Sequence, residues 1–198
     1  MLTIGITGGI GSGKTTACTV FETLGAPVYY ADTRAKELMN TDRHLKALLQ
    51  EHFGTDIYQE GRLNRKQLSA LIFNDEKRLQ MVNGWVHPAV ARDFESWLEE
   101  QSAPYVLEET AILFESGISS RFDKVILVTA PEDMRVERVC RRDAVPAATV
   151  KARMTHQWPE EKKTALADFI IYNDERHQLI PQIISIHKQL LEWFLQKN

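Results

Sequence analysis

Short apolar runs rich in Ile and Val alternate along the chain with longer segments whose hydrophobic residues recur at helical spacing. Strands separated by helices are typical of strand–helix–strand units, which build a parallel sheet covered on both faces. The pattern predicts an α/β fold, a three-layer sandwich around a five-stranded, mostly parallel sheet. The predicted strands are Leu2–Thr7, Ala26–Ala31, Pro104–Leu107, Lys124–Thr129 and Asp168–Tyr172.

The interval between the second and third predicted strands is far longer than one crossover helix requires. Residues 33–103 carry helical patterns, which predict a helical insert at one end of the sheet. Pro88 suits the first turn of the last helix of this insert, and Pro181 the first turn of a helix that closes the chain. The apolar stripes of the insert are Leu45, Leu48, Leu49 and Phe53; Leu68, Leu71 and Ile72; and Val90, Phe94, Trp97 and Leu98.

The composition restricts the class of protein. The chain of 198 residues is 43% hydrophobic and 26% charged, which fits one globular domain and argues against disorder. Its net charge of −3 excludes a globally basic nucleic-acid-binding protein. No apolar run approaches the ~20 residues of a membrane span, and neither Cys18 nor Cys140 lies in a metal-binding pair. We expect a cytoplasmic protein that binds neither nucleic acid nor a membrane.

The segment Gly8–Thr15 (GGIGSGKT) matches the phosphate-binding loop (P-loop) pattern G-x-x-x-x-G-K-[ST]. It lies between a predicted strand and a predicted helix, which is the context that this loop requires. Small residues let successive backbone N–H groups face phosphate oxygens, and the following helix adds positive potential at its N-terminus. The sequence therefore predicts a nucleoside triphosphate site. Its small residues are Gly8, Gly9, Gly11, Ser12 and Gly13.

Three side chains at the start of the helix carry the expected chemistry of this site. Lys14 would reach the β- and γ-phosphates as a mobile positive charge. The hydroxyl of Thr15 would hold Mg²⁺. We place Thr16, the next residue, with the nucleotide-binding group.

The loop alone does not separate a kinase from other nucleotide-binding proteins. A GTPase switch would need D-x-x-G and N-K-x-D segments, and neither string occurs in the sequence. An ATPase that drives a partner usually has an apolar strand that ends in acidic residues, as Val106–Glu109 does. The small size, the helical insert and an Arg-rich helix late in the chain favour a small-molecule kinase. A nucleotide or other small-metabolite kinase and, less favoured, a P-loop ATPase remain the alternatives.

Asp32 follows the second predicted strand, at the carboxyl edge of a parallel sheet, where ligands bind. A carboxylate there could orient an attacking hydroxyl and accept its proton. Asp32 could equally be the N-cap of a helix that starts at Thr33. His87 could contact the substrate, although a histidine beside a helix start is more often a capping or packing residue.

Arg135, Arg138 and Arg142 share one face of the predicted late helix. They could form a solvated face paired with neighbouring glutamates, or they could bind triphosphate oxygens. The polar segment that follows, with Gln157 near its end, could fold over the nucleotide as a lid and exclude water.

These motifs together resemble the dephospho-CoA kinase family over nearly the whole chain. There are departures from the family pattern: Glu109 and Ala111 stand where Asp and Pro are usual, and Tyr30 stands where an acidic residue is common. The resemblance rests on Ile4–Thr16, Val28–Asp32, Val86–Pro88, Ile112–Glu115, Val128–Pro131 with the arginines and Gln157 after it, and Ala167–Asn173.

The resemblance implies transfer of the γ-phosphate of ATP, with Mg²⁺, to the ribose 3′-hydroxyl of 3′-dephospho-CoA, the last step of coenzyme A biosynthesis. It implies one P-loop kinase domain, and we expect a monomer or a weak homo-oligomer. The implied parts are a nucleotide core (1–32, 104–140 and 167–198), a helical substrate-binding insert (33–103) and a lid (141–166).

The resemblance also implies roles for individual residues. Asp32 would be the base that orients the acceptor hydroxyl. Lys14 and Arg142 would stabilise charge on the transferred group, and Arg138 would contact the nucleotide. His87 and Glu109 would belong with Asp32 to the acceptor site.

Overall fold

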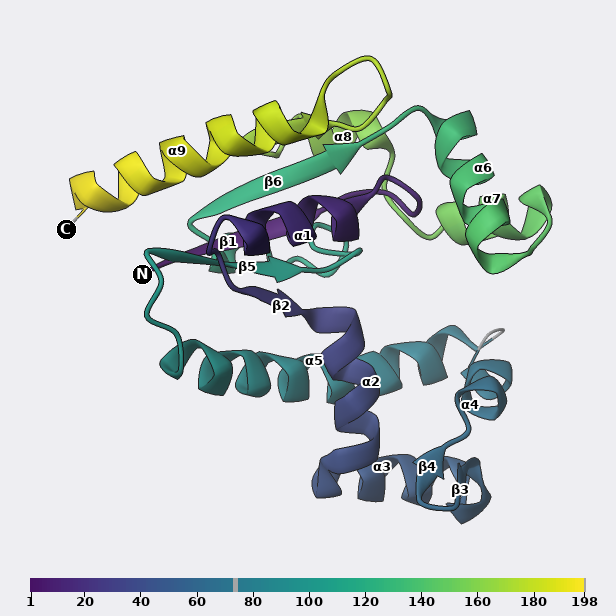
Figure 1. The fold of residues 1–198 in the computed structure, drawn as a ribbon. Coiled ribbons are helices and arrows are strands. Elements are labelled where there is room, and N and C mark those ends of the chain that lie inside the picture. The colour runs from purple at the N-terminus through teal and green to yellow at the C-terminus, as the bar shows by residue number, and fades with distance from the viewer. Residues whose placement is uncertain (73–74, 198) are drawn as a thin grey trace. The chain divides into compact units, whose positions relative to one another are not determined.

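The computed structural model of the chain describes residues 1–72 and 75–197 (Figure 1). Two compact units make up the fold. The sheet unit comprises Met1–Tyr30 and Gln101–Asn198, and the helical unit comprises Ala31–Glu100. The predicted division into core, insert and lid stays a prediction about the roles of these parts.

The sheet unit is built on five strands that pair in parallel, in the order β2-β5-β1-β6-β7. The predicted α/β fold is therefore confirmed. The strand β5 extends two residues beyond the predicted Leu107, so that it carries both Glu108 and Glu109. The strands are β1 (Leu2–Thr7), β2 (Val28–Tyr30), β5 (Tyr105–Glu109), β6 (Lys124–Thr129) and β7 (Phe169–Tyr172).

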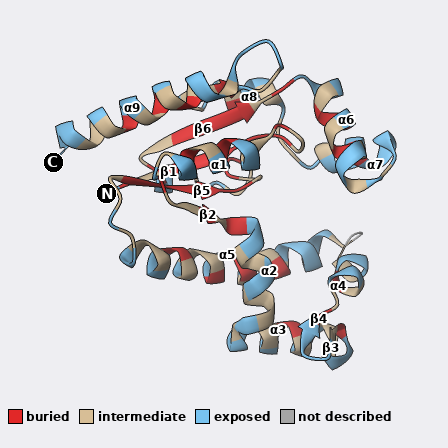
Figure 2. Cartoon of the chain, viewed as in Figure 1, coloured by how far each residue is buried: buried red, intermediate tan, exposed pale blue. Residues whose placement is uncertain are grey.

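Helices α1 (Lys14–Thr23) and α9 (Leu179–Lys197) pack on one face of the sheet (Figure 1). The apolar side chains of the central strand β1 alternate, and Ile4 and Ile6 reach this face with no exposed surface. They pack with residues of both helices, among them Phe21. Figure 2 shows the resulting buried layer along β1 and β6.

The opposite face of the sheet is covered by the segment that follows β5 and by α8 (Glu160–Thr164). The two layers approach so closely at Gly5 that a Cβ there would collide with the side chain of Leu113 and come within 2.9 Å of Phe122. The segment includes the 3₁₀ helix η2 (Ser119–Arg121). Both faces of the sheet are thus covered, as the continuous apolar runs of the strands predict.

Helices α6 (Glu132–Asp143) and α7 (Ala147–Met154) complete the sheet unit at the carboxyl end of β6. They pack on each other through a small apolar cluster of Val136, Val139 and Val150. Among residues 1–72 and 75–197, no helix has the length and apolar character that a membrane crossing requires.

The helical unit has its own hydrophobic core, to which all three predicted stripes contribute. A short hairpin, β3 (Tyr58–Gln59) and β4 (Arg62–Leu63), lies within it and was not predicted, because strands of two residues show no periodicity. Its turn residues Glu60 and Gly61 both have positive φ. The helices are α2 (Ala31–Thr41), α3 (Arg43–Phe53), the 3₁₀ helix η1 (Thr55–Ile57), α4 (Arg65–Ile72) and α5 (Glu76–Glu99).

Pro88 lies in the middle of α5, so the prediction that it begins a helix is wrong. An interior proline removes one backbone hydrogen bond and crowds the carbonyl four residues earlier, at a cost of about 3 kcal/mol. Here that earlier residue is Gly84, and buried residues on both sides of the proline, such as Val82 and Phe94, keep the helix continuous. Tertiary burial outweighs the local signal.

Candidate active site

The P-loop connects β1 to α1 and follows the course that its sequence predicts. Gly11 and Gly13 have φ values of 80° and 93°, a region that residues with a Cβ rarely adopt. A Cβ at Gly11 would also collide with the carbonyl oxygen of Arg135, and one at Gly13 with the side-chain amide of Asn173. These glycines let the loop pass closely under its neighbours.

The N-terminus of α1 has the character of an anion site. Gly13 precedes it without a side-chain cap, and its first turn carries no acidic residue. The first N–H groups of a helix have no intrahelical partner, and they attract negative charge together with the helix dipole. Thr15 and Thr16 lie in this turn with exposed side chains.

Lys14 lies across the mouth of the loop. Its Nζ donates a hydrogen bond to the carbonyl oxygen of Gly8 at 3.0 Å and lies 3.9 Å from Oε1 of Glu109. Both charged side chains are about nine-tenths buried, which strengthens their attraction. The structure thus brings together two of the predicted site residues, from α1 and from the end of β5.

The hydroxyl of Ser12 is buried and has no hydrogen-bond partner among the described residues. The backbone carbonyl oxygen of Ser12 accepts a hydrogen bond from Nδ2 of Asn173 at 2.9 Å. Ser12 therefore takes part in the loop through its backbone, and Asn173 holds the loop from the end of β7. The sequence places Asn173 in a motif of the resembled family and predicts no contact for its side chain.

The side chain of Arg138, on α6, also reaches the end of β7. Its Nη1 donates to the carbonyl oxygen of Asn173 at 3.0 Å, and its Nη2 lies 3.6 Å from Glu175. Arg142 instead pairs with its neighbour Asp143, through hydrogen bonds of 2.7 and 3.1 Å. Hydrogen bonding to Arg142 lowers the pKa of the Asp143 carboxyl. The two predicted arginines therefore have different surroundings.

Arg135 contradicts the interpretation of this helix face as solvated, because its side chain is buried. The Nη1 atom lies against Gly9, where an added Cβ would collide with it, and 3.6 Å from Oε2 of Glu160. Arg135 also lines a pocket of about 550 Å³ at the carboxyl ends of β6 and β7. Other residues of this pocket wall are Thr129, Gln157, Trp158, Glu160 and Tyr172.

Asp32 and His87 belong to the helical unit. Asp32 is exposed and is the second residue of α2, so the interpretation as an N-cap is wrong. The helix begins one residue earlier, at Ala31, directly after β2. His87 lies on α5 with an exposed side chain.

A two-pronged ion pair joins α2 to α5 close to Asp32. Nε and Nη2 of Arg34 donate to the two carboxylate oxygens of Asp93 at 2.8 and 2.6 Å. Such bidentate pairs fix geometry as well as supply energy. The pair spans 59 positions of sequence, and no local pattern could have predicted it.

The two carboxylates at the end of β5 have contrasting environments. Glu109 lies beside Lys14, whereas Glu108 points to the other face of the strand and is 3% exposed. Burial raises the pKa of Glu108 to about 7, and the charge of Arg121 lowers it only in part. Only Glu109 is placed to act at the P-loop.

The oxygen groups at the loop suit Mg²⁺, which prefers oxygen ligands and retains part of its water shell. They are the exposed hydroxyl of Thr15 and the carboxylate of Glu109. Within residues 1–72 and 75–197, no group of three or more metal-binding side chains occurs. The donors present fit an ion that phosphates and water would help to hold.

A parallel α/β sheet, a glycine loop at the carboxyl end of its central strand and a lysine at the mouth of that loop define a P-loop protein. Comparison with known proteins places it among the P-loop kinases. The family model for dephospho-CoA kinase matches residues 2–178. The chain belongs to the dephospho-CoA kinase family, whose reaction is the ATP-dependent phosphorylation of dephospho-CoA in coenzyme A biosynthesis.

Individual relatives agree with the family match. The dephospho-CoA kinase of Porphyromonas gingivalis is 43% identical over 187 residues, which cover 94% of this chain and 93% of that protein. The one from Salinibacter ruber is 41% identical over 178 residues, 88% and 89% of the two chains. The crystal structure of TT1252 from Thermus thermophilus has a TM-score of 0.82 at 35% identity and covers 96% of both chains. Dephospho-CoA kinase from Campylobacter jejuni shares the fold, with a TM-score of 0.70 at 22% identity over 96% of this chain and 97% of that one.

Proposed function

We propose that this protein transfers the γ-phosphate of ATP to the ribose 3′-hydroxyl of dephospho-CoA, giving CoA and ADP. The observation that carries the proposal is the position of Lys14 between the carbonyl oxygen of Gly8 and Glu109, at the uncapped N-terminus of α1. A triphosphate carries several negative charges, so it can draw the ammonium from a neutral carbonyl oxygen and from a single carboxylate 3.9 Å away.

The P-loop would hold the triphosphate through its backbone N–H groups and the first turn of α1. Lys14 would contact the β- and γ-phosphate oxygens and offset the charge that develops as the phosphoryl group leaves ADP. Arg138 and Arg142 would add positive charge toward the phosphates. Arg142 would first have to leave its ion pair with Asp143 and pair with the nucleotide instead. The side chain of Arg142 is 64% exposed, so it has room to move.

Asp32 would orient the acceptor and take its proton. The 3′-oxygen forms a bond to the γ-phosphorus, the bond from that phosphorus to the β-bridging oxygen breaks, and the hydroxyl proton passes to the Asp32 carboxylate. Asp32 follows Tyr30 by two residues, so its Cα lies within about 7 Å of the carboxyl end of β2. This supports a role at the ligand-binding edge of the sheet.

The hydroxyl of Thr15 would hold Mg²⁺ with the nucleotide, and Glu109, an acceptor-site residue beside Lys14, would face the same ion. The ion would neutralise phosphate charge when bound. Glu109 is one methylene longer than the family's usual aspartate, so we expect it to act through a water molecule or from a slightly different position. His87 would contact the acceptor from α5 of the helical unit.

We further propose that the protein acts in the cytoplasm as a monomer or a weak homo-oligomer, and that residues 141–166, which include α7 and α8, form the lid. A lid excludes water, which would otherwise compete with the 3′-hydroxyl for the phosphoryl group. The exposure of most side chains of α7 and its small apolar contact with α6 support this role.

One assay tests the function directly. Purified protein with ATP and Mg²⁺ should release ADP and form CoA when dephospho-CoA is added, and release little ADP with other nucleosides or with water alone. ADP release with another acceptor would favour a different metabolite kinase. Release without an acceptor would favour an ATPase, and either result contradicts the proposal.

A further inference from the structure

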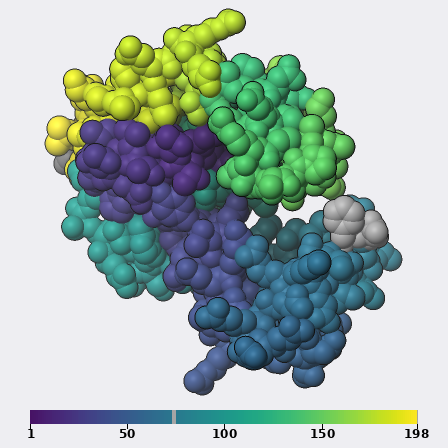
Figure 3. All heavy atoms as spheres, turned by 45° about the vertical axis from the view of Figure 1, so that its right-hand side comes forward, coloured from purple at the N-terminus to yellow at the C-terminus, as the bar shows by residue number. Residues whose placement is uncertain are grey.

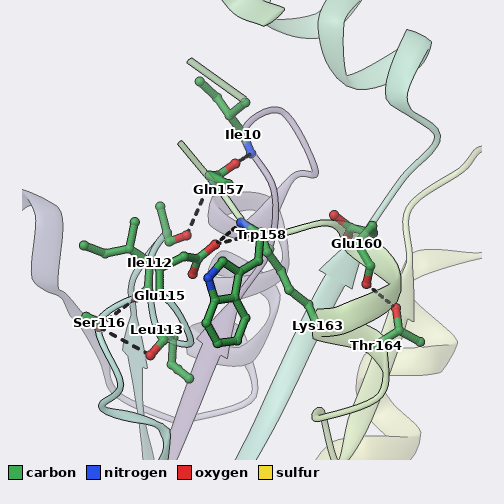
Figure 4. Close-up of polar contacts among 12 residues, drawn as sticks. Ile10, Ile112, Leu113, Glu115, Ser116, Gln157, Trp158, Glu160, Lys163 and Thr164 are labelled. Atoms are coloured by element: carbon green, nitrogen blue, oxygen red, sulfur yellow. Dashed lines mark hydrogen bonds and ion pairs between the residues drawn. The ribbon is translucent and has the colours of Figure 1, made fainter. Parts of the chain in front are cut away.

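Two consecutive residues after α7 reach back to the P-loop and to the segment after β5 (Figure 4). Oε1 of Gln157 accepts the backbone N–H of Ile10 at 2.9 Å, and its Nε2 donates to the carbonyl oxygen of Ala111 at 2.9 Å. The backbone N–H of Trp158 donates to Oε1 of Glu115 at 2.8 Å. We call Gln157 and Trp158 the loop anchor.

The side chain of Gln157 suits both of its contacts. Ile10 offers a donor and Ala111 an acceptor, and each lies in irregular backbone whose polar groups need a partner from outside. A glutamine side chain both accepts and donates, so that it pairs both groups at once. The anchor thus joins the P-loop to the turn that follows Glu109, the end of β5.

The anchor is itself held by a buried ion pair. Nζ of Lys163, which is 1% exposed, lies 3.3 Å from Oε1 of Glu115, the same oxygen that accepts from Trp158. The indole ring of Trp158 stacks on Phe114 with an interplanar angle of 8°, and the ammonium of Lys162 lies 3.2 Å from its centroid. These contacts fix the backbone of the anchor, so Gln157 has little freedom to turn away.

A second contact reaches the same half of the loop from α6. Arg135 packs against Gly9, the neighbour of Ile10, and its Nη1 lies 3.6 Å from Glu160, two residues beyond the anchor. In Figure 3 the green surface of α6 and α7 lies directly against the purple surface of the first residues of the chain. Gly9 and Ile10 are therefore supported by α6 and by the segment after α7 together.

The anchor is also continuous with α7. The backbone N–H of Gln157 donates to the carbonyl oxygen of Met154, the last residue of the helix, at 3.0 Å. The N–H of Thr155 likewise bonds to Lys151. A displacement of α7 would therefore act on Gln157, and through it on Ile10.

We propose that Gln157 is a positioning residue for the P-loop: it fixes Gly9 and Ile10 in the ATP-binding conformation and couples that conformation to α7. The N–H of Ile10 is committed to Gln157, so the phosphates are bound by the amides that follow it. The inference rests on the proposed function of the loop as the ATP site. Without the anchor, part of the free energy of ATP binding is used to order the loop. ATP then binds more weakly, while the chemical step is unchanged.

The test is Gln157→Met, which keeps the side chain's length and removes both hydrogen bonds, with Gln157→Ala as a second variant. The matched control is Gln189→Ala, at an exposed residue of α9. The side-chain amide of Gln189 donates to the carbonyl and hydroxyl oxygens of Ser185 in the same helix, at 3.3 and 3.4 Å.

Amide hydrogen exchange followed by NMR reports the contact itself. We expect the Ile10 amide to exchange at least about tenfold faster in Gln157→Met, because an open amide has lost its protection. In Gln189→Ala the Ile10 amide should keep its protection. Calorimetry should show an ATP Kd raised about tenfold in the Gln157 variants and unchanged in the control, with kcat within about threefold of the parent.

The proposal is overturned if the ATP Kd stays at the parent value, whether or not Ile10 exchanges faster. It is equally overturned if the Kd rises while the Ile10 amide remains protected. The contact between Gln157 and Ile10 would then not be the cause of the weaker ATP binding. Exchange and ATP binding need no acceptor. A parent protein that binds ATP and makes no CoA would therefore contradict the proposed function alone.

Discussion

At the scale of single residues, the site depends on which face of β5 a carboxylate occupies. Glu109 and Glu108 are neighbours in sequence, and the alternation of the strand sends them to opposite faces of the sheet. One lies 3.9 Å from Lys14, and the other is buried with a pKa of about 7. The same residue type therefore serves the P-loop at one position and destabilises the fold at the next.

Lys14→Ala should weaken both ATP binding and turnover, because the charge acts on the ground state and on the transition state. We expect an ATP Kd at least about tenfold higher and a kcat lower by about 10²-fold or more. Calorimetry and the CoA-formation assay measure the two effects. Lys66→Ala, an exposed residue on α4, is the control. Parent-like binding and turnover in Lys14→Ala would contradict the assignment of the P-loop.

Glu108→Gln should stabilise the protein at neutral and alkaline pH. Burial raises the pKa of Glu108 to about 7, so the folded state holds its proton while the unfolded state releases it at the ordinary pKa, 4.5. Stability from this group is complete below pH 4.5 and is lost as the pH rises toward 7. The difference in pKa corresponds to a free energy on the order of 3 kcal/mol above pH 7.

Urea unfolding of the parent and of Glu108→Gln at pH 5 and pH 8 tests this prediction. The variant should gain stability over the parent at the higher pH and lose part of the parent's pH dependence. Glu137→Gln, an exposed change on α6, should shift stability by less than about 0.5 kcal/mol. An equal pH dependence in parent and Glu108→Gln would show that Glu108 titrates normally.

At the scale of elements, local sequence signals agree with the structure at the end of α1 and fail in α5, where burial competes. Gly25 follows the last turn of α1 with φ of 89°, the left-handed conformation in which glycine commonly ends a helix. Pro88 does not begin a helix, because the core on either side of it keeps α5 continuous. The predicted strands agree with the structure because their apolar runs lie in a sheet covered on both faces.

Two glycines test this contrast at the level of stability. Gly84→Ala in α5 should raise the free energy of unfolding by about 0.5–1 kcal/mol, because a Cβ there meets nothing within 4 Å and alanine favours the helix. Gly25→Ala has the same open space, yet its positive φ should make the change destabilising by about 1 kcal/mol. The denaturant midpoint should therefore rise in Gly84→Ala and fall in Gly25→Ala. A gain at Gly25 would refute the backbone argument.

At the scale of the whole molecule, the sequence predicts the parts of the site and not their contacts. The P-loop is a contiguous motif, so its residues could be placed from their spacing alone. Gln157 meets Ile10 across 147 positions, and the burial of Arg135 depends on the loop that packs over it. Helical spacing shows that arginines share a face and carries no information on what covers that face.

The most direct test of the account is the turnover of Asp32→Asn, which keeps the shape of the side chain and removes its ability to accept the proton. The account predicts a kcat for CoA formation lower by about 10²–10⁴-fold, with an ATP Kd within about twofold of the parent. Asp56→Asn, at another exposed aspartate of the helical unit, should behave as the parent does. Full turnover in Asp32→Asn would remove this carboxylate from the mechanism and contradict the proposed transfer chemistry.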